Sequence, residues 1–446
     1  MSRWGPITGA TPLAFSPPLP ETADVVIIGG GIIGVCAGWA LAKAGLRAVL
    51  IEKGRVAAEQ SSRNWGWIRQ QGRDLAELPI MMEALEAWPG IAAACDIDIG
   101  LRQAGVYYLA RSAESMASYD QWRKAAQPYG LEAKLLTRAE IAGALPSASK
   151  SWTGGLLTSS DMRAEPWLAV PAMARAAQRD GLIIIEGCAA RGLDIAAGRV
   201  AGVVTQAGIV KTSQALVAAG AWSRLFLQRH GVHIPQLSVR STAMATGPMP
   251  LVHEGAMSDG KLSFRRRMDG GYTLAGSFHE LYLGRDAFSS LRSFIPQLRS
   301  DPLGTRYLPA APRGYPDAWS TPRNWALDAA SPFEAMPVLN PPPNIAKMRA
   351  VMVDFARTFP DIDPPQMRAA WAGMIDTMPD IVPVVDQAEA LPGLTIGTGM
   401  SGHGFGIGPA FGRILADMIR GVPVGHDLSR FRLDRFGGAV DLGQGL

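Results

Sequence analysis

A strand, a glycine-rich turn, a helix and a second strand follow one another near the N-terminus, and this order constrains the fold more than any other feature. Residues 23–28 are apolar and rich in β-branched side chains, which is typical of a buried parallel strand. Residues 29–34 then read Gly-Gly-Gly-Ile-Ile-Gly and match the pattern GxGxxG. Residues 35–45 favour a helix, and residues 46–51 favour a second apolar strand that ends at Glu52. The sequence therefore predicts a βαβ unit of a Rossmann-like parallel sheet.

The spacing within this unit predicts a dinucleotide site. Gly29 permits the tight turn, Gly31 lets the backbone approach a pyrophosphate, and Gly34 lets the helix pack against the sheet. The helix N-terminus attracts the phosphate charge. Glu52 follows Gly34 by 18 residues, close to the spacing of about 20 expected for the acid that accepts the ribose hydroxyls. NAD and FAD are equally compatible with the motif, whereas the Glu52 carboxylate would repel the 2′-phosphate of NADP.

Residues 25–42 also form an uncharged run of 18 residues, which is the lower limit for a membrane span. The three glycines at 29–31 argue against a continuous helix, because each weakens a helix by about 0.5–1 kcal/mol relative to alanine. The first 22 residues contain five prolines and lack a basic start followed by an apolar stretch, so no secretory signal is expected. We expect a cytoplasmic protein, with peripheral contact to the inner membrane left open.

Composition excludes several classes of protein. The 446 residues are 48% hydrophobic and only 18% charged, so the chain has material for two or three folded domains and is too apolar for extended disorder. The net charge of +4 comes with no basic block longer than residues 265–267, which argues against nucleic acid as a partner. The three cysteines lack metal-ligand or disulfide spacing, and no metal site is expected.

Two further loops favour a flavin. The polar loop 59–66 follows Glu52 and should lie at the carboxyl edge of the sheet, where its hydroxyls and amides suit a pyrophosphate or ribityl chain; an ordinary surface loop is the alternative. The glycine-rich loop 398–408 follows a strand at 394–397 and leads into a second helix. That helix N-terminus would place positive dipole near a ring that becomes anionic on reduction, unless the loop is only a close-packed turn.

Together these residues resemble the FAD-dependent amine and amino-acid oxidoreductases of the glycine oxidase, sarcosine oxidase and D-amino-acid dehydrogenase superfamily. The resemblance rests on residues 23–66, 216–222, 371–380 and 402–406. Within the superfamily the chain is similar to the bacterial L-amino-acid deaminases at residues 59–61, 209–214, 222–226, 324–328 and 331–334. It departs from them in lacking an N-terminal hydrophobic anchor, in having the Gly-His-Gly-Phe-Gly loop, and in placing Trp67 where they carry a substrate-facing glutamine.

The resemblance implies an α/β with α+β fold in which a Rossmann-like (GR2-type) FAD-binding domain is interleaved with an antiparallel-sheet substrate domain. The FAD-binding domain would comprise residues 20–90, 155–225 and 365–446, and the substrate domain residues 91–154 and 226–364. Residues 278–340 look like the module that the deaminases insert, with a helix at 286–299. Independently of the resemblance, Met268-Asp269-Gly270 between residues 261–267 and 271–275 predicts a β-hairpin with Asp-Gly at its turn.

The resemblance also implies non-covalent FAD, because the positions at which relatives carry a linking cysteine or histidine hold neither here. The residues assigned to the cofactor by motif and resemblance are Gly29, Gly31, Ile32, Ile33, Gly34, Glu52, Lys53, Gln60, Ser61, Ser62, Arg63, Ala189, Ala219, Gly220, Trp222, Gly373, Gly402, His403, Gly404, Phe405 and Gly406.

Three residues are candidates for the chemistry. Arg265 matches the carboxylate-binding arginine of the deaminases; because strand residues alternate, it shares a face with Arg267 and not with Arg266, and a solvated basic hairpin is the alternative. Trp67 either walls the pocket or belongs to the core. His403 either donates to the flavin or caps the turn.

The implied reaction is the oxidative deamination of an amino acid, with oxygen or a membrane quinone chain as the electron acceptor. Alternatives are the oxidation of N-substituted, cyclic or D-amino acids such as sarcosine and hydroxyproline, and a role as the flavoprotein subunit of a larger amine dehydrogenase.

Overall fold

The glycine loop belongs to a six-stranded sheet whose strand order is β21-β22-β13-β1-β2-β9. The computed structural model describes residues 5–300, 304–438 and 440–446. The strands are β21 (Val384–Gln387), β22 (Leu394–Thr398), β13 (Ala215–Val217), β1 (Val25–Ile28), β2 (Ala48–Ile51) and β9 (Ile183–Ile185), and all neighbours are parallel except β21 and β22. The chain leaves β1 toward β2 on one side and reaches β13 on the other. The carboxyl ends of β1 and β13 therefore form the crevice at which open parallel sheets bind ligands.

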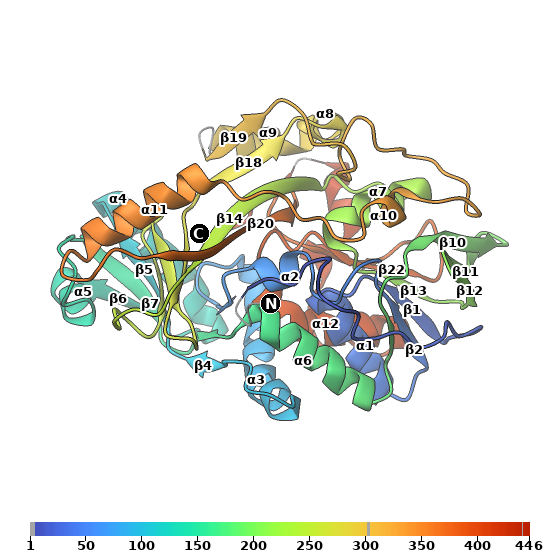
Figure 1. The fold of residues 1–446 in the computed structure, drawn as a ribbon, viewed down its shortest axis with the longest axis horizontal. Helices are drawn as coiled ribbons and strands as arrows, with labels where there is room; N and C mark the ends of the chain where they lie inside the picture. Colours follow the sequence, from blue (N-terminus) through green and yellow to red (C-terminus); the bar gives the residue numbers. More distant parts are fainter. Residues whose placement is uncertain (1–4, 301–303, 439) are drawn as a thin grey trace.

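Alternate residues of β1 enter two different cores, which explains why this strand is apolar throughout. Val25 and Ile27 pack in one core with four helices, and Val26 and Ile28 pack in a second core on the opposite face. The four helices are α1 (Ile32–Lys43), α3 (Leu78–Ala94), α6 (Pro166–Arg179) and α12 (Gly404–Arg420), and they lie together beside the sheet in Figure 1. The second core contains residues from β10 (Ala190–Ala196), β11 (Arg199–Thr205), β12 (Gly208–Lys211) and α7 (Ser223–Arg229).

The apolar run at 25–42 is thus divided between β1 and α1 rather than forming one long helix. Within the described residues, no helix combines the length and the apolar character needed to cross a membrane.

A second, ten-stranded sheet forms the other half of the molecule. Its strands are β19 (Thr305–Leu308), β18 (His279–Tyr282), β14 (Leu237–Thr246), β17 (Tyr272–Ala275), β16 (Ser263–Arg266), β15 (Ala256–Ser258), β5 (Val106–Ala110), β7 (Gly154–Thr158), β6 (Lys134–Thr137) and β20 (Met367–Thr377). The two long strands β14 and β20 pair antiparallel, from Leu237 opposite Thr377 to Thr246 opposite Met367, and cross the middle of Figure 1. The interleaved α/β and α+β fold class is confirmed. The expected cofactor segment 365–446 nevertheless begins with a strand of this second sheet.

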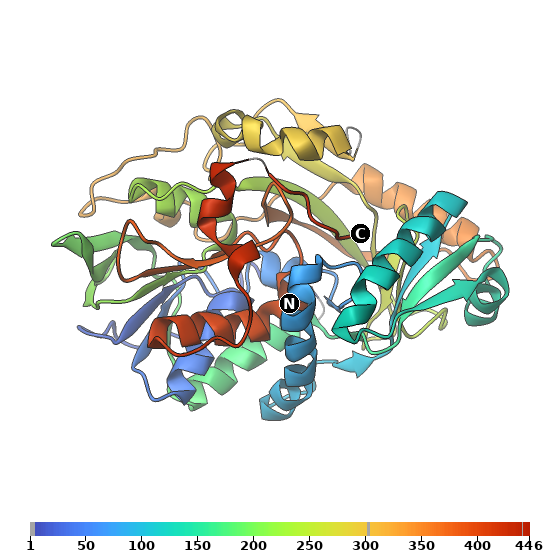
Figure 2. The ribbon, with the colours of Figure 1, turned by 180° about the vertical axis from the view of Figure 1, so that it is seen from behind.

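The predicted hairpin is confirmed, because β16 and β17 pair antiparallel with Arg266 opposite Tyr272. The helix predicted at 286–299 is present as two helices, α8 (Arg285–Ser289) and α9 (Leu291–Ser300), which are separated at Ser290. With β18 and β19, these helices lie at the top of both Figure 1 and Figure 2. The remaining elements near the site are α2 (Gln60–Arg63), α4 (Ala113–Ala126), α5 (Arg138–Ala144), α10 (Pro332–Ala335), α11 (Ile345–Thr358) and a small sheet of β3 (Trp67–Ile68), β8 (Met162–Arg163) and β4 (Arg102–Gln103).

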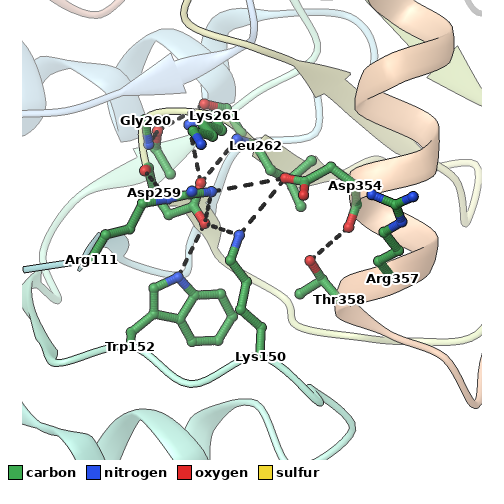
Figure 3. A network of polar contacts seen from close by, with 12 residues as sticks. Arg111, Lys150, Trp152, Asp259, Gly260, Lys261, Leu262, Asp354, Arg357 and Thr358 are labelled. Atoms are coloured by element: carbon green, nitrogen blue, oxygen red, sulfur yellow. Dashed lines mark hydrogen bonds and ion pairs between the residues drawn. The ribbon is translucent and has the colours of Figure 1, made fainter.

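The turn between β15 and β16 is fixed by a buried acid, Asp259 (Figure 3). One carboxylate oxygen accepts hydrogen bonds from Lys150 (2.6 Å), Arg111 (2.8 Å) and Trp152 (3.1 Å), and the other accepts the N–H groups of residues 261 and 262. Burial by itself raises the pKa of Asp259, but these hydrogen bonds outweigh it and hold this pKa below its usual value. The network matters for the site because the two residues flanking Asp259 line the cavity described next.

Candidate cofactor and substrate site

A cavity of about 1060 Å³ begins at the carboxyl ends of β1 and β13 and continues to the larger sheet. At the first end its lining includes Gly29 and Ala218; toward the other end it includes Ser241 of β14 and Ser115 of α4. The volume is slightly above the range of about 300–1,000 Å³ usual for ligand pockets. This cavity can therefore hold an extended ligand with a small molecule beside it.

The glycine loop packs so closely on its neighbours that side chains are excluded. Gly29 has a φ of +113°, and a Cβ there would lie 2.4 Å from the carbonyl oxygen of Ala218. A Cβ on Gly34 would lie 2.0 Å from the carbonyl oxygen of Gly29, because α1 passes directly over the turn. Gly31 is the N-cap of α1 and supplies no side-chain cap, although the Ile32 N–H donates to the hydroxyl of Ser61 (2.9 Å). The first turn of α1 is left with N–H groups and a positive dipole end for an anion.

Glu52 directly follows β2 and lines the same cavity. Its Oε2 accepts the N–H of Gly30 (2.7 Å) and its Oε1 accepts the N–H of Gly54 (2.7 Å). Burial raises the pKa of Glu52 to about 7, even though the charge of Lys53 and the two N–H donors act in the opposite direction. The two hydrogen bonds that Glu52 accepts leave other lone pairs of its carboxylate free. Glu52 can therefore also accept hydrogen bonds from hydroxyl groups of a ligand.

This pKa predicts that cofactor affinity depends on pH. The ribose hydroxyls donate to the ionised carboxylate, so FAD binding favours the deprotonated form of Glu52. The affinity for FAD should therefore be highest above about pH 7. As the pH falls below this pKa, the association constant should decrease toward about tenfold per pH unit. Quenching of FAD fluorescence by the apoprotein, titrated from about pH 5.5 to about pH 8.5, measures the dissociation constant. Glu52→Gln should bind FAD more weakly than the wild type above about pH 7 and should show no pH-dependent step; a wild-type constant that does not change with pH would contradict the assignment.

The second glycine loop brings the first turn of α12 to the cavity. His403 is the N-cap of α12, but its side chain makes no capping hydrogen bond, so it does not cap the turn. Its Nε2 lies 3.1 Å from the guanidinium of Arg69, and its carbonyl oxygen accepts from Arg73 (2.9 Å). Burial, together with the two guanidinium charges, lowers the pKa of His403 well below its usual value. The ring is therefore neutral, with Nε2 accepting from Arg69 and the proton on Nδ1.

The structure corrects the expectation that Arg265 points into the pocket. Its side chain is 0% exposed and donates from both terminal nitrogens to Glu165 (3.0 Å each), while Nε donates to the carbonyl of Trp65 (2.5 Å). The predicted alternation is right, since Arg265 and Arg267 are both buried and Arg266 lies on the other face. However, the buried face packs beneath the 65–67 loop instead of opening on the cavity.

Trp67 does line the cavity, and its ring meets that of Trp65 edge to face with 5.5 Å between the centroids. The assigned cofactor residues that line the cavity are Gly29, Gly31, Ile32, Ile33, Glu52, Lys53, Gln60, Ser61, Arg63, Ala219, Gly220, Trp222, Gly373, Gly402, His403, Gly404 and Phe405.

Four assigned residues lie behind this lining. Gly34 closes the contact between helix and turn, and Ala189 packs in the second core. The Ser62 hydroxyl accepts the N–H of Ile7 (3.1 Å) and is turned away from the cavity. Gly406 accepts a hydrogen bond from the indole of Trp88 (2.8 Å) and packs against β3. These residues shape the cavity without lining it.

Sequence reasoning missed Arg69 and Asp376, which both line the cavity. Arg69 follows Trp67 by two residues, a spacing that places both side chains on one face of an extended chain. Asp376 lies in a segment that carries the resemblance, and its carboxylate accepts the N–H of Gly399 (2.8 Å). Burial raises the pKa of Asp376 to about 6. The alternation of side chains along residues 67–69 could have indicated Arg69. No feature of the sequence around Asp376 predicts that this side chain is buried.

Comparison with known proteins identifies the group to which the chain belongs. The family model described as FAD dependent oxidoreductase (DAO) matches residues 24–418. The chain belongs to the FAD dependent oxidoreductase family. Among solved structures, L-amino acid deaminase from Proteus myxofaciens in complex with anthranilate has a TM-score of 0.91 and 28% sequence identity, covering 96% of this chain and 97% of that one.

Curated relatives include glycine oxidase from Geobacillus kaustophilus (strain HTA426), which is 24% identical over 94% of this chain and 98% of its own length. Human sarcosine dehydrogenase is 28% identical over 52% of this chain. That match spans only 26% of the human protein, and the match to the mouse enzyme likewise spans 26% of its length.

The residues of this family member fit FAD, the cofactor of the family. The loop at Gly29 and Gly34 leaves no room for side chains where a pyrophosphate needs the backbone, and Glu52 offers an acceptor for ribose hydroxyls at the end of β2. The first turn of α12, which has no side-chain cap, faces the same cavity. None of the three cysteines, Cys36, Cys95 and Cys188, belongs to the lining.

Proposed function

We propose that the protein oxidatively deaminates an amino acid. Bound FAD supplies the acceptor for the hydride that leaves the α-carbon, and water hydrolyses the resulting imine to a 2-oxo acid and ammonia. The observation that carries this proposal is the continuous cavity, which joins the dinucleotide cradle at Gly29 to a compartment beneath β14. The likeness to L-amino acid deaminase over nearly the full length of both chains supports the choice of substrate class.

The residues of the chain position the reactants and exclude water. The indoles of Trp65 and Trp67 form an apolar wall of the compartment. The N-terminus of α12 contributes positive dipole at the end of the cavity where Gly402 and Gly404 lie, and this dipole would stabilise negative charge on a flavin ring bound there. His403 is neutral and engaged by Arg69, so we assign it a positioning role and no proton transfer. The amine accordingly enters the reaction in its uncharged form.

A second candidate function is the oxidation of an N-substituted amino acid by a multisubunit enzyme. It is supported by the likeness to sarcosine oxidase subunit beta of Rhizobium meliloti, which is 24% identical over 93% of this chain and 88% of that protein. In this case the isolated chain should bind FAD without turning over any free amino acid.

The test is anaerobic reduction of the flavin in the purified holoprotein by a panel of L-amino acids, D-amino acids, sarcosine and hydroxyprolines. We expect bleaching by one group of primary amino acids, with ammonia and 2-oxo acid in equal amounts. Bleaching by sarcosine or hydroxyproline alone would contradict the deamination of a primary amino acid, and a loaded flavin that no compound bleaches would favour the second candidate. Admission of air then tests oxygen as the acceptor, and acid denaturation that releases all yellow colour from the pellet tests the proposed non-covalent attachment.

A further inference from the structure

Three of the lysine and arginine side chains that line the cavity, Arg55, Arg63 and Arg69, form no ion pair within the described part of the chain. Lys53 and Arg73 are each paired with a glutamate. Arg55 and Arg63 donate to backbone carbonyls, and Arg63 also to a side-chain amide. Arg69 is half-buried and, within the described part of the chain, has no carboxylate within ion-pair distance; it donates to the carbonyl of residue 71 and to an imidazole. A cationic side chain that faces the cavity without forming an ion pair favours an anion at this position.

The local backbone directs Arg69 toward the cavity. Ile68 is buried against α12, where its Cα would be 3.1 Å from a Cβ on Gly406. Because side chains alternate along an extended segment, Trp67 and Arg69 point to the opposite side, and both line the cavity. The indole Nε1 of Trp67 is buried and has no hydrogen-bond acceptor among the residues that the structure describes. Of the two side chains, Arg69 is the one whose charged group is available to a ligand in the cavity.

The guanidinium of Arg69 is held in place from two directions. One terminal nitrogen donates to the backbone carbonyl of Gln71, and the other contacts the neutral His403 ring at 3.1 Å. Its planar group also lies 5.9 Å from the centre of the Tyr108 ring. These contacts use two donors of a five-donor group, so others, including Nε, are left for a ligand. An arginine fixed in this way loses little side-chain entropy when it binds a carboxylate.

We propose that Arg69 binds the carboxylate of the substrate, the role that the resemblance assigned to Arg265. Arg265 cannot take this role, because Glu165 already occupies both of its terminal nitrogens. The inference rests on the proposed function and adds to it the site's preference for substrates with a free carboxylate. Amines and amino-acid amides lack the anion and should be poor substrates.

The test compares acid and amide substrates in Arg69→Met. For the wild type, the amino acid that bleaches the flavin best should exceed its carboxamide in kcat/KM by about 10²–10³-fold, the range expected for a charge-assisted pair out of water. Arg69→Met should lose most of this ratio by becoming slower on the acid while changing little on the amide. Arg69→Lys should retain part of it. The matched control is Arg102→Met, on β4 of the same small sheet as Trp67, whose side chain is exposed and lies outside the cavity.

A binding measurement makes the inference independent of turnover. Anthranilate, the ligand of the Proteus myxofaciens deaminase structure, should perturb the visible spectrum of the holoprotein, and 2-aminobenzamide, which lacks the charge, should bind at least tenfold more weakly. Arg69→Met should abolish this difference and keep its full flavin content, and Arg102→Met should preserve it. If no amino acid bleaches the flavin but the difference is present and lost in Arg69→Met, the proposed reaction fails and the Arg69 site stands. If Arg69→Met affects acid and amide equally, or if the wild type does not distinguish them, the Arg69 site is overturned.

Discussion

Arg265→Met should lower the free energy of unfolding by about 3–5 kcal/mol, because it leaves the Glu165 carboxylate charged and buried without its partner. Both side chains of this pair are 0% exposed, and two hydrogen bonds of 3.0 Å join them. Burial alone raises the pKa of Glu165, but Arg265 and the Met268 N–H outweigh burial and hold this pKa below its usual value. The guanidinium also packs beneath Gly66, whose Cβ, if present, would lie 2.9 Å from the Arg265 Cζ. The variant should therefore also loosen the wall formed by the 65–67 loop.

Chemical denaturation of the holoprotein, with flavin content and circular dichroism followed together, measures the loss. Arg102→Met removes a pair whose side chains are 51% and 53% exposed and should change stability by no more than about 1 kcal/mol. Arg265→Met combined with Glu165→Leu should recover much of the loss, because no lone buried charge remains. The lowered pKa of Glu165 also determines how the stabilisation by the Arg265–Glu165 pair depends on pH. The stabilisation is present above the unfolded-state pKa of about 4.3 and is lost as the pH falls through the lower folded-state pKa. Arg265→Met with wild-type stability at neutral pH would contradict the structural role.

The Arg265–Glu165 pair also shows what could not be predicted from the sequence. Strand alternation around the hairpin predicted that Arg265 and Arg267 share a face, and this is observed. Which way that face points depends on Glu165, 100 residues earlier in the chain, and on the glycine at position 66. Neither contact can be predicted from the residues next to Arg265 in the sequence. A resemblance aligns residue types but does not show that an acid elsewhere has taken the guanidinium.

The nucleotide end could be predicted more fully, because its constraints are local. The turn at Gly29, the helix start at Gly31 and the acid at Glu52 lie within one βαβ unit, where backbone geometry fixes their relative positions. Arg69 lies outside any such unit. Among the described residues no carboxylate lies within ion-pair distance of Arg69, which depends on the tertiary structure, and only its alternation with Trp67 could be predicted from the sequence. The substrate end of the cavity, built from distant segments, is accordingly where prediction was weakest.

Gly34→Ala should have the second large effect, on cofactor affinity as well as stability. The new methyl group would lie 2.0 Å from the carbonyl oxygen of Gly29, which belongs to the backbone and cannot rotate aside. Helix α1 must then move away from the turn, at a cost of about 1–3 kcal/mol or more for overpacking. The same movement separates the first-turn N–H groups from the pyrophosphate. Loss of two charge-assisted hydrogen bonds at about 1.5–3 kcal/mol each corresponds to at least a hundredfold weaker FAD binding.

Gly90→Ala is the matched control, because it makes the same change in another helix, α3, where a Cβ would meet nothing within 4 Å. It should leave FAD affinity unchanged and stabilise the protein by up to about 1 kcal/mol, since alanine restricts the unfolded chain more than glycine does. Titration of the two apoproteins with FAD, monitored by fluorescence quenching, gives the affinities. Thermal unfolding without FAD separates the stability loss from the binding loss. If Gly34→Ala bound FAD as tightly as Gly90→Ala, the close contact between α1 and the turn would not be what holds the backbone in position for the pyrophosphate.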